Sequence, residues 1–349
     1  MLLRAQLRSQ LLCGPPARDP VAVVERLLAV QGQDNRGVRL AIRPRSQGLT
    51  AGDVDRALTA DRSLVITWLN RGTLHLVRRE DYPWLHALTT PPIATANHRR
   101  LAEEGVSPLD GERGVAVIER SLAVNGPMTR KQLGEQLDAA GIPTKGQALI
   151  HLLIASSLAG LTVRGPMIGS EHAYVLTRDW LGESSPVDRD LALAELARRY
   201  LVGHGPANDR DLAKWAGLPL RDVRRGLAAI ASELHPRADG LLELVKRPRV
   251  GNGPPPRLLG AFDPLLLGWQ SRLPLLGSHQ GVVTVNGIFR PIALVEGEAV
   301  GTWKVEGGSV RLTPFEALTP KAEAGLATDA EDVARYLGIP GTGLVLEPS

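Results

Sequence analysis

A repeated order of short helices followed by a two-stranded hairpin constrains the fold of this chain more than any other feature. In the first copy, residues 21–29 place apolar side chains at helical spacing, and a second helix is expected to begin near residue 35. Residues 64–69 and 73–77 then read as strands on either side of a tight turn at 70–72. Helices followed by a hairpin are the order of a winged helix.

Two further copies follow, and each has a Gly-Pro break after its first helix. The breaks are Gly126-Pro127 and Gly205-Pro206, and two short helical stretches and at least one strand come after each of them. In the second copy the last helix is rich in leucine and isoleucine and is expected to be core. In the third copy the last helix, from about residue 220 to 232, carries arginines instead. A recurring unit of this kind predicts tandem domains.

The run Pro254-Pro255-Pro256 marks a boundary beyond which short strands replace helices. Residues 281–289 carry the strongest hairpin signal in the chain, with Asn286-Gly287 at the turn. More strands follow, and residues 328–331 are expected to cap a last helix. We therefore expect an α+β fold with three tandem winged-helix domains and a small antiparallel β domain at the C-terminus. The expected domains are residues 1–110, 111–185, 186–253 and 254–349.

Composition narrows the class of protein. The chain has 349 residues and a formal net charge of +4, a mild basic bias that favours an anionic partner. Cys13 is the only cysteine and the histidines show no metal-ligand spacing, so we expect no disulfide, no metal and no cofactor. No apolar run reaches the length that spans a bilayer, and no long heptad segment supports a dimer. These features predict a cytoplasmic, nucleoid-associated monomer.

The segment Gln31-Gly32-Gln33 lies between the first two expected helices. Side chains two residues apart point to different sides of a helix but to the same side of an extended segment, and Gly32 favours a non-helical conformation. Two neutral amides can therefore aim at one point. The alternative is an ordinary polar turn between two helices. Asp34 is the nearest carboxylate, and it is either a rival catalytic group or the N-cap of the helix that follows.

Two clusters of arginines at helical spacing are candidates for contacts with DNA phosphates. They comprise Arg36, Arg39 and Arg43 after the glutamine segment, and Arg221, Arg224 and Arg225 in the third copy. Winged helices bind DNA by laying a helix in the major groove, and such arginines suit that role. The alternative is that both clusters are merely solvated, since winged helices also serve as scaffolds and protein-binding modules.

Four stretches of the sequence together resemble a known family, the AlkZ-type bacterial winged-helix DNA glycosylases. They span nearly the whole chain in the order of that family, which makes them more specific than any single motif. The stretches are Val30-Gln31-Gly32-Gln33-Asp34, Thr67 to His75, Leu259-Gly260-Ala261-Phe262-Asp263-Pro264 with Gly268-Trp269, and Val285-Asn286-Gly287 through Val300-Gly301-Thr302-Trp303.

The resemblance implies three tandem winged helices closed by a β domain. It implies a monofunctional glycosylase that excises bulky N7-alkylated purines from duplex DNA, and in some members unhooks interstrand crosslinks. One branch of the family has a Gln-x-Gln catalytic motif and serves in self-resistance to genotoxic antibiotics, whereas another has Gln-x-Asp and a broader role on crosslinks. Gln31 and Gln33 match the first branch and are the expected catalytic residues. Gly32 departs from the family, where the middle position is usually larger and more apolar.

The remaining candidate residues each have two interpretations. Arg71, at the tip of the first wing, either contacts phosphate or is a solvated turn residue. His75 either lines the base pocket or is structural within the wing. Asp34 is a second candidate for the base pocket. Asn286 and Arg290 either probe a DNA groove or only close the β domain.

A non-catalytic winged-helix regulator of transcription is the alternative function for the whole chain. The paired glutamines favour the enzyme, because a regulator has no use for them. An N7-alkylguanine is already cationic, so its excision needs an oriented water and stabilisation of the developing positive sugar rather than a strong acid. Amide oxygens can supply both. The expected partner is therefore double-stranded DNA that carries alkylated purines.

Overall fold

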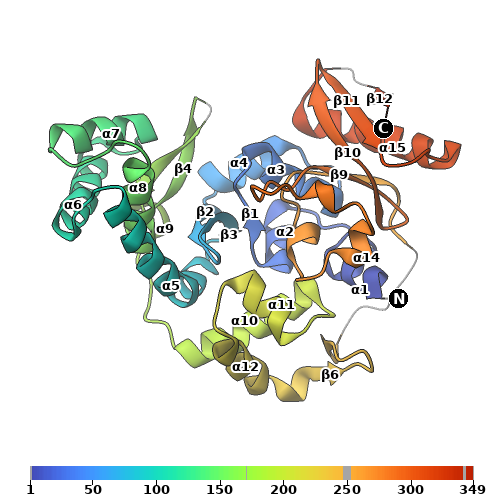
Figure 1. Ribbon diagram of the computed structural model, residues 1–349, viewed down its shortest axis with the longest axis horizontal. Coiled ribbons are helices and arrows are strands. Elements are labelled where there is room, and N and C mark those ends of the chain that lie inside the picture. Colours follow the sequence, from blue (N-terminus) through green and yellow to red (C-terminus); the bar gives the residue numbers. More distant parts are fainter. Residues whose placement is uncertain (1, 170, 247–252, 341–342, 349) are drawn as a thin grey trace. The chain divides into compact units, whose positions relative to one another are not determined.

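The computed structural model describes residues 2–169, 171–246, 253–340 and 343–348, which form a mixed α and β structure (Figure 1). The chain divides into two compact units. The first unit comprises Met1–Asp55, Leu193–Trp215 and Pro219–Ser349, and the second comprises Arg56–Ala192 and Ala216–Leu218.

The second unit is built on two antiparallel hairpins. Strand β2 (Leu64–Leu69) pairs with β3 (Thr73–Arg78) along its whole length, and β4 (Thr162–Ile168) pairs with β5 (Glu171–Leu176). The bridge between Ile66 and Arg164 joins them in the order β3-β2-β4-β5. Both hairpins were predicted from the sequence and are confirmed. Their union in one sheet was not foreseen.

Five helices complete the second unit: α5 (Tyr82–Glu103), α6 (Pro108–Asn125), α7 (Arg130–Ala139), α8 (Ala148–Leu158) and α9 (Thr177–Leu181). The predicted core role of α8 is confirmed, because Leu152 and Leu153 are fully buried in one apolar cluster with Leu133 and Tyr174. The sequence Thr129-Arg130-Lys131-Gln132 predicts a capping box at the start of α7, and the structure confirms it.

In the second unit one prediction is wrong and one helix was not predicted. The sequence Thr144-Lys145-Gly146-Gln147 predicts a second capping box, but α8 begins without a side-chain cap. The Thr144 hydroxyl instead donates to the Asp138 carboxylate. Helix α5 was not predicted at all, since Pro91 and Pro92 lie inside it and proline normally breaks a helix.

The first unit contains the helices of the first and third sequence repeats. They are α1 (Leu2–Ser9), α2 (Pro20–Leu27), α3 (Asn35–Leu40), α4 (Ala51–Thr59), α10 (Arg189–His204), α11 (Asp209–Ala216) and α12 (Leu220–Ala229), of which α4, α10 and α11 run in sequence across the division between the units. Strands β6 (Leu234–Pro236) and β7 (Leu242–Leu244) pair as a short antiparallel hairpin after α12. The order of elements predicted for the third repeat is therefore confirmed.

A five-stranded sheet forms the C-terminal part of the first unit, in the order β12-β11-β10-β9-β8. The strands are β8 (Arg257–Leu259), β9 (Ile292–Val295), β10 (Glu298–Glu306), β11 (Ser309–Pro314) and β12 (Leu344–Leu346). The sheet was expected to be wholly antiparallel. This is corrected at one edge, where β12 pairs with β11 in parallel.

Helix α15 (Pro320–Leu337) packs on this sheet (Figure 1). Apolar side chains from the helix and the strands form one buried core between them. Leu326, Val333 and Tyr336 from the helix are buried against Trp303 and Leu312 from the strands. The helix begins at Pro320 with Thr319 as its N-cap, rather than at the cap predicted for residues 328–331. Thr328 instead donates its hydroxyl to the Ala324 carbonyl within the helix.

The expected hairpin at residues 281–289 keeps its turn but not its strands. Gly287 has a φ of 73° at the turn, and its N–H donates to the Thr284 carbonyl at 2.9 Å. The flanking strands reduce to the single bridge between Val283 and Phe289. An isolated two-stranded hairpin is marginal without a neighbour to cover one face, and Val285 and Ile288 are 103% and 52% exposed. We call residues 283–289 the tip loop.

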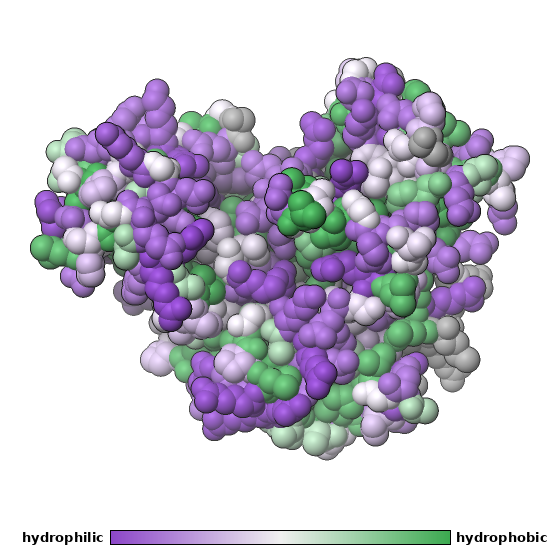
Figure 2. Space-filling model, viewed as in Figure 1, coloured by the Kyte–Doolittle hydropathy of each residue, from purple (hydrophilic) through white to green (hydrophobic). Residues whose placement is uncertain are grey.

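Three short helical elements precede the tip loop in sequence: α13 (Pro264–Leu267), α14 (Leu273–Leu276) and the 3-10 turn Gln280–Val282. The face of the molecule seen in Figure 2 is mostly hydrophilic and is broken by small apolar patches. Among the helices of the described residues, none is both long and apolar enough to cross a membrane.

Candidate active site and nucleic-acid interface

The glutamine segment is non-helical, as the sequence predicted. Helix α2 ends at Leu27, and Leu28 adopts a φ of 65°, which turns the chain into the short strand β1 (Val30–Gln31). Helix α3 begins at Asn35, so Gln31 and Gln33 lie in the extended and turn segment between two helices. Gln31 is 7% exposed, and Gln33 is exposed. The two amides therefore differ in how far they are open to solvent.

Asp34 caps helix α3. Its backbone is extended, and its carboxylate accepts a hydrogen bond from the Gly37 N–H. A side-chain acceptor at this position satisfies one of the N–H groups that the first turn of a helix leaves without a partner. The prediction that Asp34 is an N-cap is therefore confirmed. Its carboxylate is hydrogen-bonded to the backbone of α3, directly after the two glutamines.

The expected exposed face of Arg36, Arg39 and Arg43 does not exist. Helix α3 ends at Leu40, and Arg43 lies in the 3-10 turn Arg43–Arg45. Arg36 is exposed, whereas Arg39 is only 8% exposed and pairs with the Asp55 carboxylate. Because Arg39 and Arg43 are buried and only Arg36 is exposed, the three side chains do not form one exposed face.

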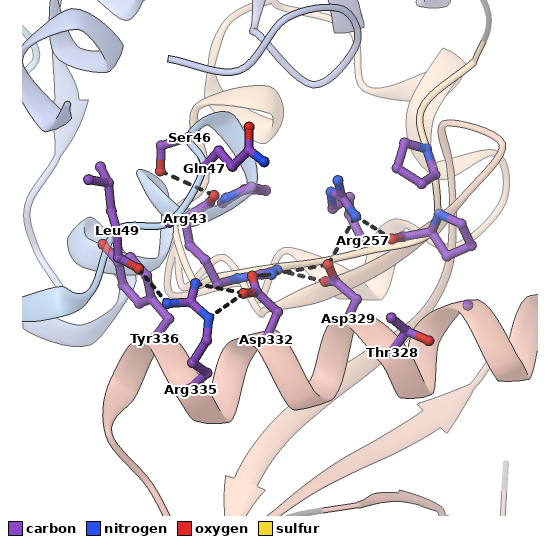
Figure 3. Close-up of a pocket in the computed structure, with 15 residues that line it drawn as sticks. Arg43, Ser46, Gln47, Leu49, Arg257, Thr328, Asp329, Asp332, Arg335 and Tyr336 are labelled. Atoms are coloured by element: carbon purple, nitrogen blue, oxygen red, sulfur yellow. Dashed lines mark hydrogen bonds and ion pairs between the residues drawn. The ribbon is translucent and has the colours of Figure 1, made fainter. Parts of the chain in front are cut away.

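Arg43 is buried in an ion-pair network with helix α15 (Figure 3). Its guanidinium donates to Asp329 at 2.7 and 3.0 Å, to Asp332 at 2.8 Å, and to the Leu258 carbonyl at 2.8 Å. The side chain is 1% exposed. A guanidinium with these partners would have to break a buried ion pair to reach a phosphate. The prediction that Arg43 contacts DNA is therefore wrong on geometric grounds, and its role is structural.

Arg45 and Asp263 form a second buried ion pair, which the sequence did not suggest. Two guanidinium nitrogens of Arg45 donate to the two carboxylate oxygens of Asp263 at 2.7 and 2.8 Å, and both side chains are 0% exposed. Arg45 also donates to the carbonyls of Gln10 and Ala41 at 2.9 and 2.8 Å. The only available signal was Asp263-Pro264, an N-cap followed by proline at a helix start.

The other family-like stretches in the first unit are structural in the same way. The indole of Trp269 donates to the Pro206 carbonyl at 3.1 Å and packs against the His204 ring. The indole of Trp303 donates to the Leu259 carbonyl at 2.8 Å. A Cβ on Gly301 would lie 2.7 Å from the Thr313 carbonyl oxygen, so this strand position accepts only glycine. These residues hold the C-terminal part of the unit together.

His75 is buried within the β2–β3 hairpin of the second unit. The side chain is 2% exposed, and its Nδ1 lies 2.9 Å from the Thr73 carbonyl oxygen. Burial, together with the nearby positive charge of Arg71, lowers the pKa of His75 to about 3, so the ring is neutral. The hydrogen bond places the ring proton on Nδ1 and leaves Nε2 as an acceptor.

Arg71 lies beside this histidine in the tight turn of the hairpin and is half-buried. Asn70, before it, has a φ of 48°, and its buried side-chain amide has no hydrogen-bond partner within the described residues. The turn that was predicted at residues 70–72 is therefore present. The roles predicted for Arg71 at a phosphate and for His75 in the base pocket stay predictions.

Two further groups of predicted DNA contacts in the first unit are exposed. Asn286 and Arg290, at the tip loop, are both exposed. On helix α12, Arg221 and Arg224 have side chains that are 86% and 61% exposed, and Arg225 is also exposed. Unlike Arg43, these side chains are not buried, although Arg221 lies 3.7 Å from Asp222 and Arg224 pairs with Asp209 at 2.7 Å.

Comparison with known proteins places the chain in a family. The model of the DNA glycosylase AlkZ-like family matches residues 24–336. The chain belongs to this family. The match includes the glutamine segment, the β2–β3 hairpin, the Arg45–Asp263 pair and most of helix α15.

Two relatives from Streptomyces sahachiroi support the assignment to the AlkZ-like family. One, named an interstrand DNA cross-link repair glycosylase, is 26% identical over 360 residues, which cover 93% of this chain and 92% of the relative. The solved structure of the DNA glycosylase AlkZ superposes with a TM-score of 0.81 at 23% identity, over 99% of this chain and 98% of that one. This second likeness shows the fold.

Proposed function

We propose that this member of the AlkZ-like family is a monofunctional DNA glycosylase that hydrolyses the N-glycosidic bond of N7-alkylated guanine in duplex DNA. The observation that carries the proposal is the pair Gln31 and Gln33, held in a non-helical segment of a chain that matches the family over residues 24–336. The relative named as a cross-link repair glycosylase supports crosslinked guanine as a substrate too.

The chemistry suits two amides. Hydrolysis breaks the bond between C1′ and N9 and leaves its electron pair on the purine, which the positive charge of an N7-alkylated ring accepts. Water then supplies the oxygen bonded to C1′ and releases a proton. Preorganised amide oxygens can orient that water and stabilise the positive charge developing on the sugar. Gln31, Gln33 and Asp34 offer no amine for a covalent Schiff base, so we propose water as the nucleophile.

Asp34 supports this assignment indirectly. Its carboxylate accepts the Gly37 N–H, so it is less available to activate a water than a carboxylate without a backbone partner. We therefore assign to Asp34 the role of fixing the start of α3 next to the glutamines.

Each run of helices and hairpin is proposed to be a winged helix, which gives three winged helices and a C-terminal β domain with boundaries near residues 110, 185 and 253. The order α10, α11, α12 and β6–β7 in the third repeat supports this division. Arg36, Arg71, Asn286 and Arg290 are proposed to contact DNA, and α12 is proposed to contribute Arg221, Arg224 and Arg225. We propose that the protein acts as a monomer in the cytoplasm.

Substrate choice is proposed to extend to bulky adducts of genotoxic natural products, with a role in self-resistance. Gly32 supports a roomy site, because the position between the two glutamines carries no side chain. The test is base release from three duplexes that carry N7-methylguanine, a bulkier N7 adduct or an N7–N7 interstrand crosslink. Release from the first two supports the glycosylase, and release from the third extends it to crosslinks. Tight binding of one palindromic sequence with no base release would favour a regulator instead.

A further inference from the structure

Three residues join the sheet of the first unit to helix α13. Gly260, Ala261 and Phe262 follow strand β8 directly and precede Asp263, which caps α13 and pairs with Arg45. We call residues 260–262 the connector. Gly260 and Ala261 contact helix α3, which follows the glutamine segment. Phe262 contacts the tip loop.

Helix α3 packs on the connector backbone to backbone. A Cβ on Gly37 would lie 2.5 Å from the Ala261 carbonyl oxygen. A Cβ on Gly260 would lie 2.8 Å from the Leu40 Cβ and 3.3 Å from the Gly37 carbonyl oxygen. Contacts of 2.5 and 2.8 Å essentially do not occur for real Cβ atoms, and the Ala261 carbonyl, as part of the backbone, cannot swing aside as a flexible side chain can. The two glycines therefore fix the separation between α3 and the connector.

The tip loop is attached at Phe262. The Phe262 N–H donates to the Phe289 carbonyl at 3.3 Å, and the two rings lie 5.7 Å apart between centroids. Phe262 has a φ of 56°, which is uncommon for a residue with a side chain. A strained backbone persists only where its surroundings determine it. Here the surroundings include Phe289 and the buried Arg45–Asp263 pair that follows in sequence.

The glutamine segment is tied to the same place. Gly37, which touches Ala261, donates its N–H to the Asp34 carboxylate, and Asp34 follows Gln33 directly. If α3 moves away from the connector, Gly37 carries the Asp34 cap with it, and Gln33, the adjacent residue, moves too. The link from the connector to the two glutamines runs through Gly37 and Asp34.

We propose that the connector holds the Gln31–Gln33 segment and the tip loop in one fixed relation, and that Gly37 and Phe262 are positioning residues for hydrolysis. This inference rests on the proposed glycosylase function. Val285 and Ile288 expose apolar side chains at the tip loop, beside the exposed Arg290, and such a loop suits contact with DNA. The connector then sets where the two amides lie relative to DNA that the loop engages. A misplacement of about 1 Å can slow a reaction about a hundredfold.

The test compares Gly37→Ala with Gly52→Ala, a matched change in helix α4. Both substitutions add one methyl group to a helix of the first unit, but a Cβ on Gly52 meets only the Thr50 hydroxyl at 3.5 Å. We expect Gly37→Ala to lower the single-turnover rate of base release at least about tenfold, with DNA affinity within about twofold of the unsubstituted protein. Gly52→Ala should leave both unchanged. A Gly37→Ala rate equal to that of Gly52→Ala would overturn the inference.

A second pair of variants keeps the test decisive if Gly37→Ala does not fold. Phe262→Leu removes the ring contact with Phe289, and Phe262→Tyr keeps it. We expect Phe262→Leu to slow base release while Phe262→Tyr restores the rate, at a temperature well below the unfolding transition of each variant. Equal rates for both contradict the inference. If the unsubstituted protein releases no base at all, the proposed function fails instead, so the two failures are distinguishable.

Discussion

The guanidinium of Arg45 and the carboxylate of Asp263 lie 218 residues apart in sequence and form a two-bonded ion pair with no exposed surface on either side chain. Arg45 comes five residues after helix α3, and Asp263 comes directly after the connector. The pair therefore holds the segment that follows the glutamines against the start of α13. Its geometry is set by residues that no local sequence pattern links.

We expect Asp263→Ala to lower the free energy of unfolding by about 3–5 kcal/mol, because removal of one partner leaves a charge buried without its counter-ion. The comparison is Glu103→Ala, which breaks the pair of Arg100 and Glu103, with side chains 59% and 58% exposed. That change should cost less than about 1 kcal/mol. Denaturant unfolding measures both. Similar costs for the two variants would show that the Arg45–Asp263 pair is not buried in solution.

Sequence reasoning failed at the arginines for a physical reason. Spacing placed Arg36, Arg39 and Arg43 on one helix face, but the helix ends at Leu40. The acceptors that bury Arg43 are Asp329 and Asp332, 286 and 289 residues away. Local periodicity has no information about partners at such distances, so an arginine in an ion pair and an arginine at a phosphate look alike in the sequence.

Binding to duplex DNA should be independent of sequence and sensitive to salt. If about four phosphates are contacted, the slope of log K against log salt concentration is expected near −3.6, since each released counter-ion adds about −0.9. Arg221→Ala should make the slope shallower by about 0.9, because its side chain is 86% exposed. Arg43→Ala should leave the slope unchanged and reduce stability instead. Titrations at several salt concentrations check both, and an equal loss of slope in Arg43→Ala would count against its structural role.

Stability should fall in mild acid because of His75. Its pKa in the folded protein is about 3, below the ordinary value of about 6.5. Between these two pH values the unfolded chain binds a proton that the folded protein does not, so stability is present above about pH 6.5 and is lost as the pH falls toward 3. The contribution approaches about 1.4 kcal/mol per pH unit. Unfolding of His75→Asn measured at pH 6 and 4.5 should show a smaller loss than the unsubstituted protein. Equal losses in the two proteins would mean that His75 is not held neutral.

Substitutions of Asp34 test whether its carboxylate is an N-cap or a catalytic group. Asp34→Ala should lower the free energy of unfolding by about 1 kcal/mol, because α3 loses its N-cap, and Asp34→Asn should cost less, since asparagine also caps. Base release should change less in Asp34→Asn than in either glutamine variant. Unfolding curves and release rates on the same preparations check this. A loss of release in Asp34→Asn with unchanged stability would make the carboxylate the catalyst.

The non-helical glutamine segment was predictable because its signals are local. Two helices with clear periodicity flank Gly32, and the Asp34 carboxylate caps the second of them. The contacts that position the segment were not predictable. Gly37 gave no sign that it touches Ala261, since a glycine in a helix usually signals only weak helix propensity. The tip loop was overestimated as a hairpin because the turn at Asn286-Gly287 is local, whereas strands need extended pairing, and within the described residues the loop has only the Val283–Phe289 bridge.

The most direct test of the central claim is base release from N7-methylguanine duplex DNA by Gln31→Ala, Gln33→Ala and the double variant, with DNA affinity and unfolding measured beside it. We expect each single change to lower the rate by about one to four powers of ten, with affinity and stability nearly unchanged. The double variant should lose less than the sum of the two free-energy changes, because one water cannot be misplaced twice. Full activity in both single variants, with release abolished by Asp34→Asn, would contradict the assignment of the two amides.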